Sequence, residues 1–215
     1  FQTFRADAVA AATARKAEYQ ARETGAAESQ LAMLKALELS EDDFAALYDE
    51  CRRVGIEFMS TPFDLDSLAF LAGRLKVRRL KCPSGEITNG PFLLAMARTG
   101  LPVILSTGMA DMAEIGDALA VLGFGYTMRR DPESLAEVRE AWEQPVVRAA
   151  LREKATVLHC TSAYPAPMSD LNLLAMRSIA ETFGLPVGYS DHSNGLHVSV
   201  AAVAMGALCI EKHFT

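Results

Sequence analysis

The chain repeats one local pattern, in which a short run of apolar or β-branched residues is followed directly by small hydroxyl residues or glycine. Runs of this length and composition are typical of buried β-strands. Seven such runs predict strands at residues 1–4, 56–59, 79–82, 102–105, 156–160, 186–189 and 208–210.

The segments between these runs predict amphipathic helices. In residues 42–54, apolar side chains recur at helical spacing and form one face. Ser40 precedes this segment and Asp43 follows three residues later, a pattern typical of a helix N-cap with an acidic first turn. The longer connection at residues 123–154 predicts a helical insertion.

Alternating strands and helices indicate a parallel sheet, which leaves a Rossmann-like open sheet or a (β/α)8 barrel. A barrel brings the carboxyl end of every strand to one face, so polar residues after nearly every strand favour a truncated α/β (β/α)8 TIM barrel. We expect one domain over residues 1–215. Seven strands leave the barrel one short, so we expect its first strand and the end of the gene to lie outside this sequence.

Composition narrows the classes of partner. The net charge of -6 arises without a long block of one sign, which argues against nucleic acid as a partner. The longest apolar stretch, residues 198–210, is interrupted by Ser199 and Gly206 and is too short to cross a membrane.

Features of the cysteines and of the first residues indicate the compartment. The four cysteines are widely spaced, and three lie in apolar runs, which favours reduced, buried thiols. The first four residues lack the charged start and hydrophobic core of a signal peptide. We therefore expect a cytoplasmic protein.

Two histidines, His192 and His213, each follow a predicted strand near the end of the chain. Two imidazoles on one barrel face form a plausible open site for a divalent metal, with water and substrate oxygens as the other ligands. Spacing alone leaves the alternative that each histidine has only a packing role.

A second group of residues suggests an anion site. A lysine directed into a barrel is costly to desolvate unless it meets an anion, so Lys81 predicts a bound phosphate or carboxylate, unless its side chain extends outward to water. Short hydroxyls after the strands can bind phosphate, although each alone is also typical of a turn or a cap. The principal ones are Thr61, Ser84, Ser106 and Ser190.

Two further residues have open roles. Glu86 is a candidate acid or base, with a carboxylate that complements a helix dipole as the alternative. Tyr164 lies in a proline-flanked loop suited to holding a sugar, or it packs beneath that loop.

At these motifs the sequence resembles the bacterial N-acetylneuraminate synthase family, which includes the legionaminic and pseudaminic acid synthases. The likeness rests on FQTF, AEYQ, ESQLAMLKALELS, FMSTPFD, KCPSGEITN, VILSTGMA, VLHCTSAYPAP, VGYSDHS and IEKHFT, and it runs nearly end to end. It implies a (β/α)8 barrel followed by a small antifreeze-like domain that is absent here, and a homodimer of the full-length protein.

The resemblance also implies roles for individual residues. His192 and His213 would bind a divalent metal, usually Mn²⁺, with Mg²⁺ or Co²⁺ as alternatives. Glu86 matches an essential carboxylate, and Tyr164 matches a residue near the acceptor sugar. The residues around phosphoenolpyruvate would be Thr61, Lys81, Ser84, Ser106, Ser162 and Ser190, although the family often has Asn in place of Ser162.

The implied activity is metal-dependent condensation of phosphoenolpyruvate with an N-acetylated aldehyde sugar. N-acetylmannosamine, which yields N-acetylneuraminate, is our first expectation for the acceptor. A diacetylated acceptor, as in the N,N'-diacetyllegionaminate synthases, is the main alternative, and a non-catalytic sugar-binding barrel is a remote one.

Overall fold

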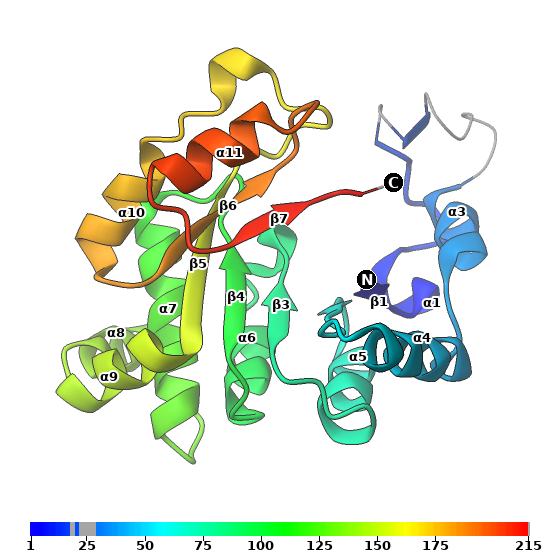
Figure 1. Cartoon of the computed structure of the whole chain (residues 1–215). Helices are drawn as coiled ribbons and strands as arrows, with labels where there is room; N and C mark the ends of the chain where they lie inside the picture. The colour runs from blue at the N-terminus through cyan, green and yellow to red at the C-terminus, as the bar shows by residue number, and fades with distance from the viewer. Residues whose placement is uncertain (18–19, 22–28, 215) are drawn as a thin grey trace. The chain divides into compact units, whose positions relative to one another are not determined.

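The computed structural model describes residues 1–17, 20–21 and 29–214 (Figure 1). The motif residues Glu18, Tyr19, Glu28 and Thr215 lie outside the described residues. The chain forms two compact units, Phe1–Arg78 and Arg79–Thr215. In the described part of the chain, no helix is long and apolar enough to cross a membrane.

The first unit contains two short parallel strands and several helices. Gln2 pairs with Thr61 and Thr3 pairs with Pro62. Its elements are β1 Gln2–Thr3, α1 Ala6–Val9, α3 Gln30–Leu37, α4 Glu41–Val54, β2 Thr61–Pro62 and α5 Leu65–Ala69, followed by a π-helical turn at Phe70–Arg74.

The second strand lies later than predicted. We expected it at residues 56–59, but Ile56 is 61% exposed. Phe58 is buried and its ring packs against the rings of Phe1 and Tyr48. The backbone bonds to β1 begin only at Met59, whose carbonyl accepts from the amino terminus. The apolar run therefore fills an aromatic cluster, and the paired strand follows it.

Helix α4 confirms the predicted helix. The Ser40 side chain accepts a hydrogen bond from the Asp43 backbone, and the Asp43 carboxylate accepts one from the Ser40 backbone, so both form a capping box. The helix ends at Gly55, whose φ of 79° places it in the left-handed region that glycine adopts easily.

The second unit consists of a five-stranded parallel sheet and the helices that connect its strands. The predicted helical insertion, residues 123–154, falls in α7 Met112–Thr127, α8 Leu135–Trp142 and α9 Pro145–Lys154. The strands are β3 Leu80–Cys82, β4 Val103–Ser106, β5 Ala155–Cys160, β6 Val187–Asp191 and β7 Ile210–Lys212. The helices are α6 Gly90–Arg98, α7 Met112–Thr127, α8 Leu135–Trp142, α9 Pro145–Lys154, α10 Ala175–Phe183 and α11 His197–Ala204, with short 3₁₀ turns at Ser84–Glu86 and Met168–Asp170.

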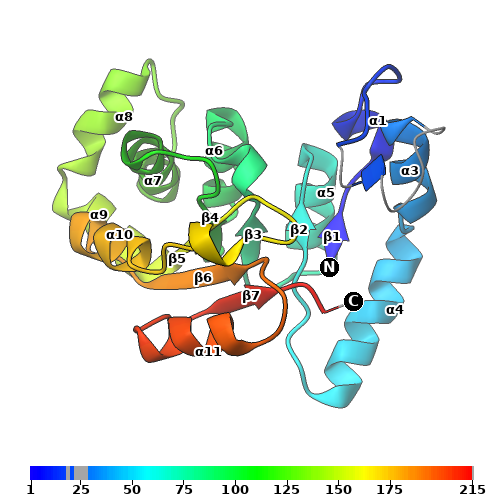
Figure 2. The same cartoon turned by 90° about the horizontal axis from the view of Figure 1, so that it is seen from above.

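The strands of this sheet lie in chain order, β3-β4-β5-β6-β7, and every neighbouring pair is parallel. An open doubly wound sheet would reverse its strand order at a switch point, and no reversal occurs here. The sheet curls, and its helices lie around one side of it (Figure 2). This arrangement is that of part of a barrel.

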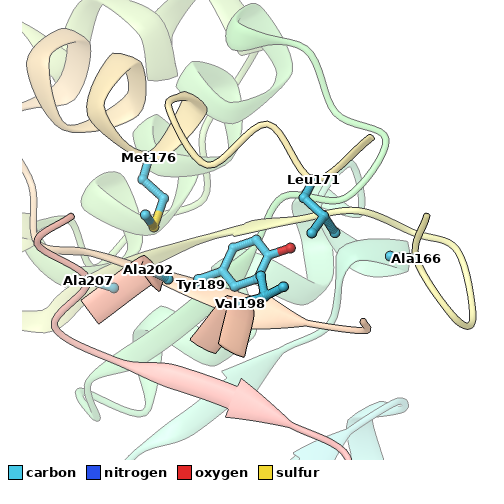
Figure 3. Close-up of a cluster of buried hydrophobic side chains, with 7 residues drawn as sticks. All are labelled: Ala166, Leu171, Met176, Tyr189, Val198, Ala202 and Ala207. Atoms are coloured by element: carbon cyan, nitrogen blue, oxygen red, sulfur yellow. The ribbon is translucent and has the colours of Figure 1, made fainter. Parts of the chain in front are cut away.

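The two faces of the sheet have different roles. The helix-covered face buries apolar side chains, and α10 and α11 pack on β6. Figure 3 shows Tyr189 at the centre of one cluster there, with Met176, Leu171 and Val198 around it. Because side chains alternate along a strand, Ser190 faces the opposite, inner side.

Candidate active site

The strand register brings the polar residues of four strands onto the inner face of the sheet. Lys81 is the register partner of Ile104. Ser106 lies two residues after Ile104, so Lys81 and Ser106 face the same side of the sheet. Ser190 is paired with Glu211. These residues lie at or near the carboxyl ends of their strands, where parallel α/β proteins place their sites.

Glu211 is the hub of this group, and sequence reasoning missed it. Its Oε2 accepts hydrogen bonds from Ser190 Oγ at 2.6 Å and Ser106 Oγ at 3.4 Å. Its Oε1 lies 3.3 Å from Lys81 Nζ. Three groups predicted to bind an anion therefore already surround a carboxylate. The sequence does indicate its location, because Glu211 lies two residues before His213 and the two side chains therefore share one face of the strand.

Lys81 does not extend outward to water. Its side chain is buried, with 4% of the residue exposed, and its Nζ also donates to the carbonyl oxygen of Cys82 at 2.9 Å. A buried ammonium is stable only when it is paired, and here Glu211 supplies the opposite charge. The alternative that Lys81 reaches solvent is wrong.

His192 and His213 lie next to each other beyond the ends of β6 and β7. Their ring centroids are 5.7 Å apart and the ring planes are inclined by 63°. His192 Nδ1 lies 2.8 Å from the Thr161 carbonyl oxygen, so this nitrogen carries the proton that it donates. Ser190 Oγ, 3.4 Å from Nε2, already donates its proton to Glu211. The Nε2 lone pair is thus left available for a ligand.

The distance between the two rings fits a shared metal ion. An ion bonded to one nitrogen of each ring at about 2.1 Å lies about 3.2 Å from each ring centre, so the centroids should be roughly 4.5–6.4 Å apart. The observed 5.7 Å falls within that range. Among the described residues no group of three or more His, Cys, Asp or Glu side chains is placed to hold a metal.

Tyr164 lies against both imidazoles. Its ring stacks on His192 with centroids 4.1 Å apart, and it meets His213 edge-on at 5.5 Å. Tyr164 is 43% exposed. The residue thus forms a wall beside the histidine pair and presents part of its surface to solvent, which is compatible with either role predicted for it.

Ser84 and Ser162 meet at Gly108. The Gly108 backbone N–H donates to Ser84 Oγ at 2.9 Å. A Cβ at Gly108 would lie only 2.1 Å from Ser162 Oγ and 2.9 Å from Ser84 Oγ. A side chain at position 108 would therefore displace both serine hydroxyls, and glycine leaves room for the loop after β4 beside the loops after β3 and β5.

Two further predicted site residues, Glu86 and Thr61, belong to other local structures. The Glu86 carboxylate accepts a hydrogen bond from Asn89 Nδ2 at 2.7 Å, and Asn89 caps α6. This contact favours the local, helix-supporting alternative for Glu86, and its catalytic role stays a prediction. Thr61 belongs to β2 of the first unit, where it is buried.

Nearby ionisable groups have shifted pKa values. Burial raises the pKa of the Cys82 thiol to about 12 and also raises the pKa of Cys160, so both remain thiols at neutral pH. Burial also tends to raise the pKa of Asp191, but hydrogen bonds from Ser193, Ser199 and Lys212 outweigh this effect and lower it to about 2. Asp191 is therefore an anion at neutral pH.

The fold and this group of residues define a parallel α/β-barrel protein with a lysine, hydroxyls and two imidazoles at the carboxyl ends of its strands. The model of the NeuB family matches residues 1–215, and the chain belongs to this family. The predicted family and the fold class, part of a (β/α)8 barrel, are confirmed.

Named relatives cover the whole chain. The N,N'-diacetyllegionaminic acid synthase of Legionella pneumophila is 46% identical over 215 residues, which are 100% of this chain and 54% of that protein. The enzyme of the same name from Campylobacter jejuni is 43% identical over 215 residues, 100% of this chain and 57% of its own length. The chain thus spans about half the length of these curated relatives.

A solved structure shows the same fold. The N-acetylneuraminic acid synthetase from Leptospira borgpetersenii, determined in complex with citrate, is 29% identical to this chain. It superimposes with a TM-score of 0.75 and covers 100% of this chain and 61% of its own.

Proposed function

We propose that this chain carries part of the active site of a synthase that condenses phosphoenolpyruvate with an N,N'-diacetylated aldehyde sugar. Family membership supports the reaction class. The names of the two relatives favour the diacetylated acceptor over N-acetylmannosamine, which was our first expectation from the sequence. The observation that carries the proposal is the convergence of Lys81, Ser106 and Ser190 on one carboxylate beside two imidazoles.

Phosphoenolpyruvate is the anion that suits the donors of the inner face. Lys81, Ser106 and Ser190 are buried and directed at Glu211. A phosphate or carboxylate would take over hydrogen bonds that Glu211 now accepts, with donors already oriented and desolvated. Ser84 and Ser162 complete the proposed set, and the role of Thr61 stays a prediction from the sequence.

His192 and His213 are the proposed metal ligands, with Mn²⁺ as the expected ion and Mg²⁺ or Co²⁺ as alternatives. A divalent metal bound there supplies Lewis acidity to the aldehyde oxygen. The Thr161 carbonyl holds His192 in the tautomer that leaves Nε2 for such a ligand. Tyr164, stacked on His192, would bound the acceptor sugar on that side.

The proposed reaction forms a bond between C3 of phosphoenolpyruvate and the aldehyde carbon, whose oxygen takes up a proton. Water then adds to the oxocarbenium carbon C2 and loses a proton. Cleavage of the bond between C2 and the phosphate ester oxygen releases inorganic phosphate, and the new C2 hydroxyl loses its proton to leave the 2-keto group. Lys81 and the serine hydroxyls hold the phosphate for this departure. Glu86 remains a proposed acid or base, although its observed contact is local.

The proposal is tested by assaying the full-length protein with phosphoenolpyruvate and each of two acceptors, N-acetylmannosamine and the diacetylated bacillosamine-derived sugar. Phosphate release and the mass of the product are measured. We expect faster turnover of the diacetylated sugar. Faster turnover of N-acetylmannosamine would overturn the proposed acceptor. Phosphate release with neither sugar would overturn the condensation and favour a non-catalytic sugar-binding barrel.

N-acetylneuraminate synthesis remains the second candidate, because the solved relative with a TM-score of 0.75 is an N-acetylneuraminic acid synthetase. The acceptor assay distinguishes the two. A homodimer of the full-length protein is also proposed, and sedimentation equilibrium tests it.

A further inference from the structure

A buried ionic group lies on the outer face of β6 and β7, behind the two histidines. We call Asp191, Ser193, Ser199 and Lys212 the Asp191 cluster. Asp191 is fully buried, and its Oδ1 accepts from the Ser193 backbone at 2.9 Å and from Ser193 Oγ at 2.6 Å. Its Oδ2 accepts from Ser199 Oγ at 2.5 Å and from Lys212 Nζ at 3.0 Å. All four donors converge on one carboxylate.

Lys212 is the only member of the Asp191 cluster that comes from β7. Its Nζ also donates to the Ser193 carbonyl oxygen at 2.8 Å, so one ammonium joins β7 both to β6 and to the loop after β6. Asp191 and Lys212 are register partners and the last residues of their strands. The ion pair therefore connects the two strands at the point where each of them ends.

The next residue on each strand is a histidine. Because successive side chains alternate between faces, His192 and His213 emerge on the inner face directly beyond this outer ion pair. A shared ion requires their nitrogens to converge within a few tenths of an ångström of the bonding distance, so the spacing of the two strand ends matters. His213 lies beyond the last residue of β7 and is exposed.

We propose that the Asp191–Lys212 ion pair is a positioning device that sets the separation of His192 and His213 and thereby the affinity of the site for its metal. The inference rests on the proposed function, in which these histidines bind a divalent ion. Lys212 acts through the histidines and is a positioning residue. Partners that orient metal ligands typically change metal affinity 10- to 100-fold when they are removed.

The test compares Mn²⁺ binding by full-length wild-type protein and the Lys212→Met variant, measured as free Mn²⁺ by electron paramagnetic resonance after removal of bound metal. Lys212→Met keeps the aliphatic stem and leaves Asp191 with three donors, but it removes the cation paired with a buried carboxylate, so we expect a folded protein with a lowered Tm. We expect the dissociation constant for Mn²⁺ to rise about 10- to 100-fold.

Ser199→Ala is the matched control. It also removes one hydrogen bond to Asp191 Oδ2, but Ser199 belongs to α11 and its loss leaves the link between β6 and β7. We expect a change of about threefold or less in Mn²⁺ affinity. If Lys212→Met does not fold, Lys212→Gln replaces it, because glutamine can still donate to the Ser193 carbonyl but cannot form the ion pair.

The outcomes separate this inference from the proposed function. Wild-type Mn²⁺ affinity in a folded Lys212 variant overturns the positioning role alone. An equal loss in Ser199→Ala and Lys212→Met also overturns it, because the loss would then follow from general damage to the Asp191 cluster. Absence of Mn²⁺ binding by the wild-type protein overturns both the metal site and the inference.

Discussion

Replacement of Lys81 by methionine tests the proposed anion site most directly. The side chain is buried, its Nζ lies 3.3 Å from Glu211 Oε1, and methionine fills most of the same volume without the charge. Glu211 keeps its two serine donors, and its side chain is 36% exposed, so water can solvate the carboxylate that loses its cation. We therefore expect the variant to fold.

The size of the effect follows from the burial of Lys81. Truncating one partner of a buried, hydrogen-bonded charge pair costs about 2–5 kcal/mol of binding free energy. The lower part of that range applies, because the Lys81 ammonium also pairs with Glu211. A loss of about 2–3 kcal/mol corresponds to binding of phosphoenolpyruvate that is roughly 30- to 150-fold weaker.

Isothermal titration calorimetry of the full-length protein with phosphoenolpyruvate measures this loss. Lys154→Met is the matched control, because Lys154 Nζ also donates to a backbone carbonyl, that of Gly100 at 3.1 Å, but at an exposed position. We expect wild-type affinity for that variant. If a folded Lys81→Met protein bound phosphoenolpyruvate within threefold of wild type, Lys81 would not be part of the anion site.

Three further predictions concern other residues. His192→Ala and His213→Ala should each lower turnover at least about 100-fold. Added Mn²⁺ should restore the activity of chelator-treated wild-type protein but not that of either variant. Full activity in either variant contradicts the ligand assignment. Because burial raises the pKa of Cys82 to about 12, iodoacetamide at pH 8 should leave this thiol unmodified until denaturant is added, as peptide mass mapping will show. The Tyr189 hydroxyl is buried without a hydrogen-bond partner of normal geometry among the described residues. Tyr189→Phe should therefore raise the free energy of unfolding by up to about 1 kcal/mol, measured by calorimetry. A clear fall in Tm would show that the hydroxyl has a hydrogen-bond partner.

Most of the fold follows from local sequence patterns. Parallel strands that alternate with helices follow from the apolar runs, and the hydroxyls after them favour a barrel over an open sheet. The exception, at residues 56–59, shows the limit of such a pattern. Phe58 is buried by contacts with aromatic rings instead of by strand pairing, and periodicity in a short apolar run does not distinguish these two ways of burying a side chain.

The barrel pattern predicted that residues after different strands share one face, and alternation along a strand relates the residues that lie two positions apart. Ser190 and His192 are two residues apart and therefore face the same side, as do Glu211 and His213. This spacing could have placed Glu211 on the inner face, but its hydrogen-bond partners were not predictable, because one of them, Ser106, lies 105 residues earlier in the chain. A long-range contact between two polar side chains leaves no periodic signal in a single sequence.

The roles of Lys81 and Lys212 can be separated by experiment, because the two side chains lie on opposite faces of the sheet. Lys81 belongs to the inner face and should affect phosphoenolpyruvate whether or not a metal is bound. Lys212 belongs to the outer face and should affect phosphoenolpyruvate only through the metal and the histidines. Titration of metal-free protein therefore distinguishes them: Lys81→Met should weaken phosphoenolpyruvate binding there, whereas Lys212→Met should leave it close to wild type. A loss in both variants would mean that the ion pair on the outer face also shapes the anion site.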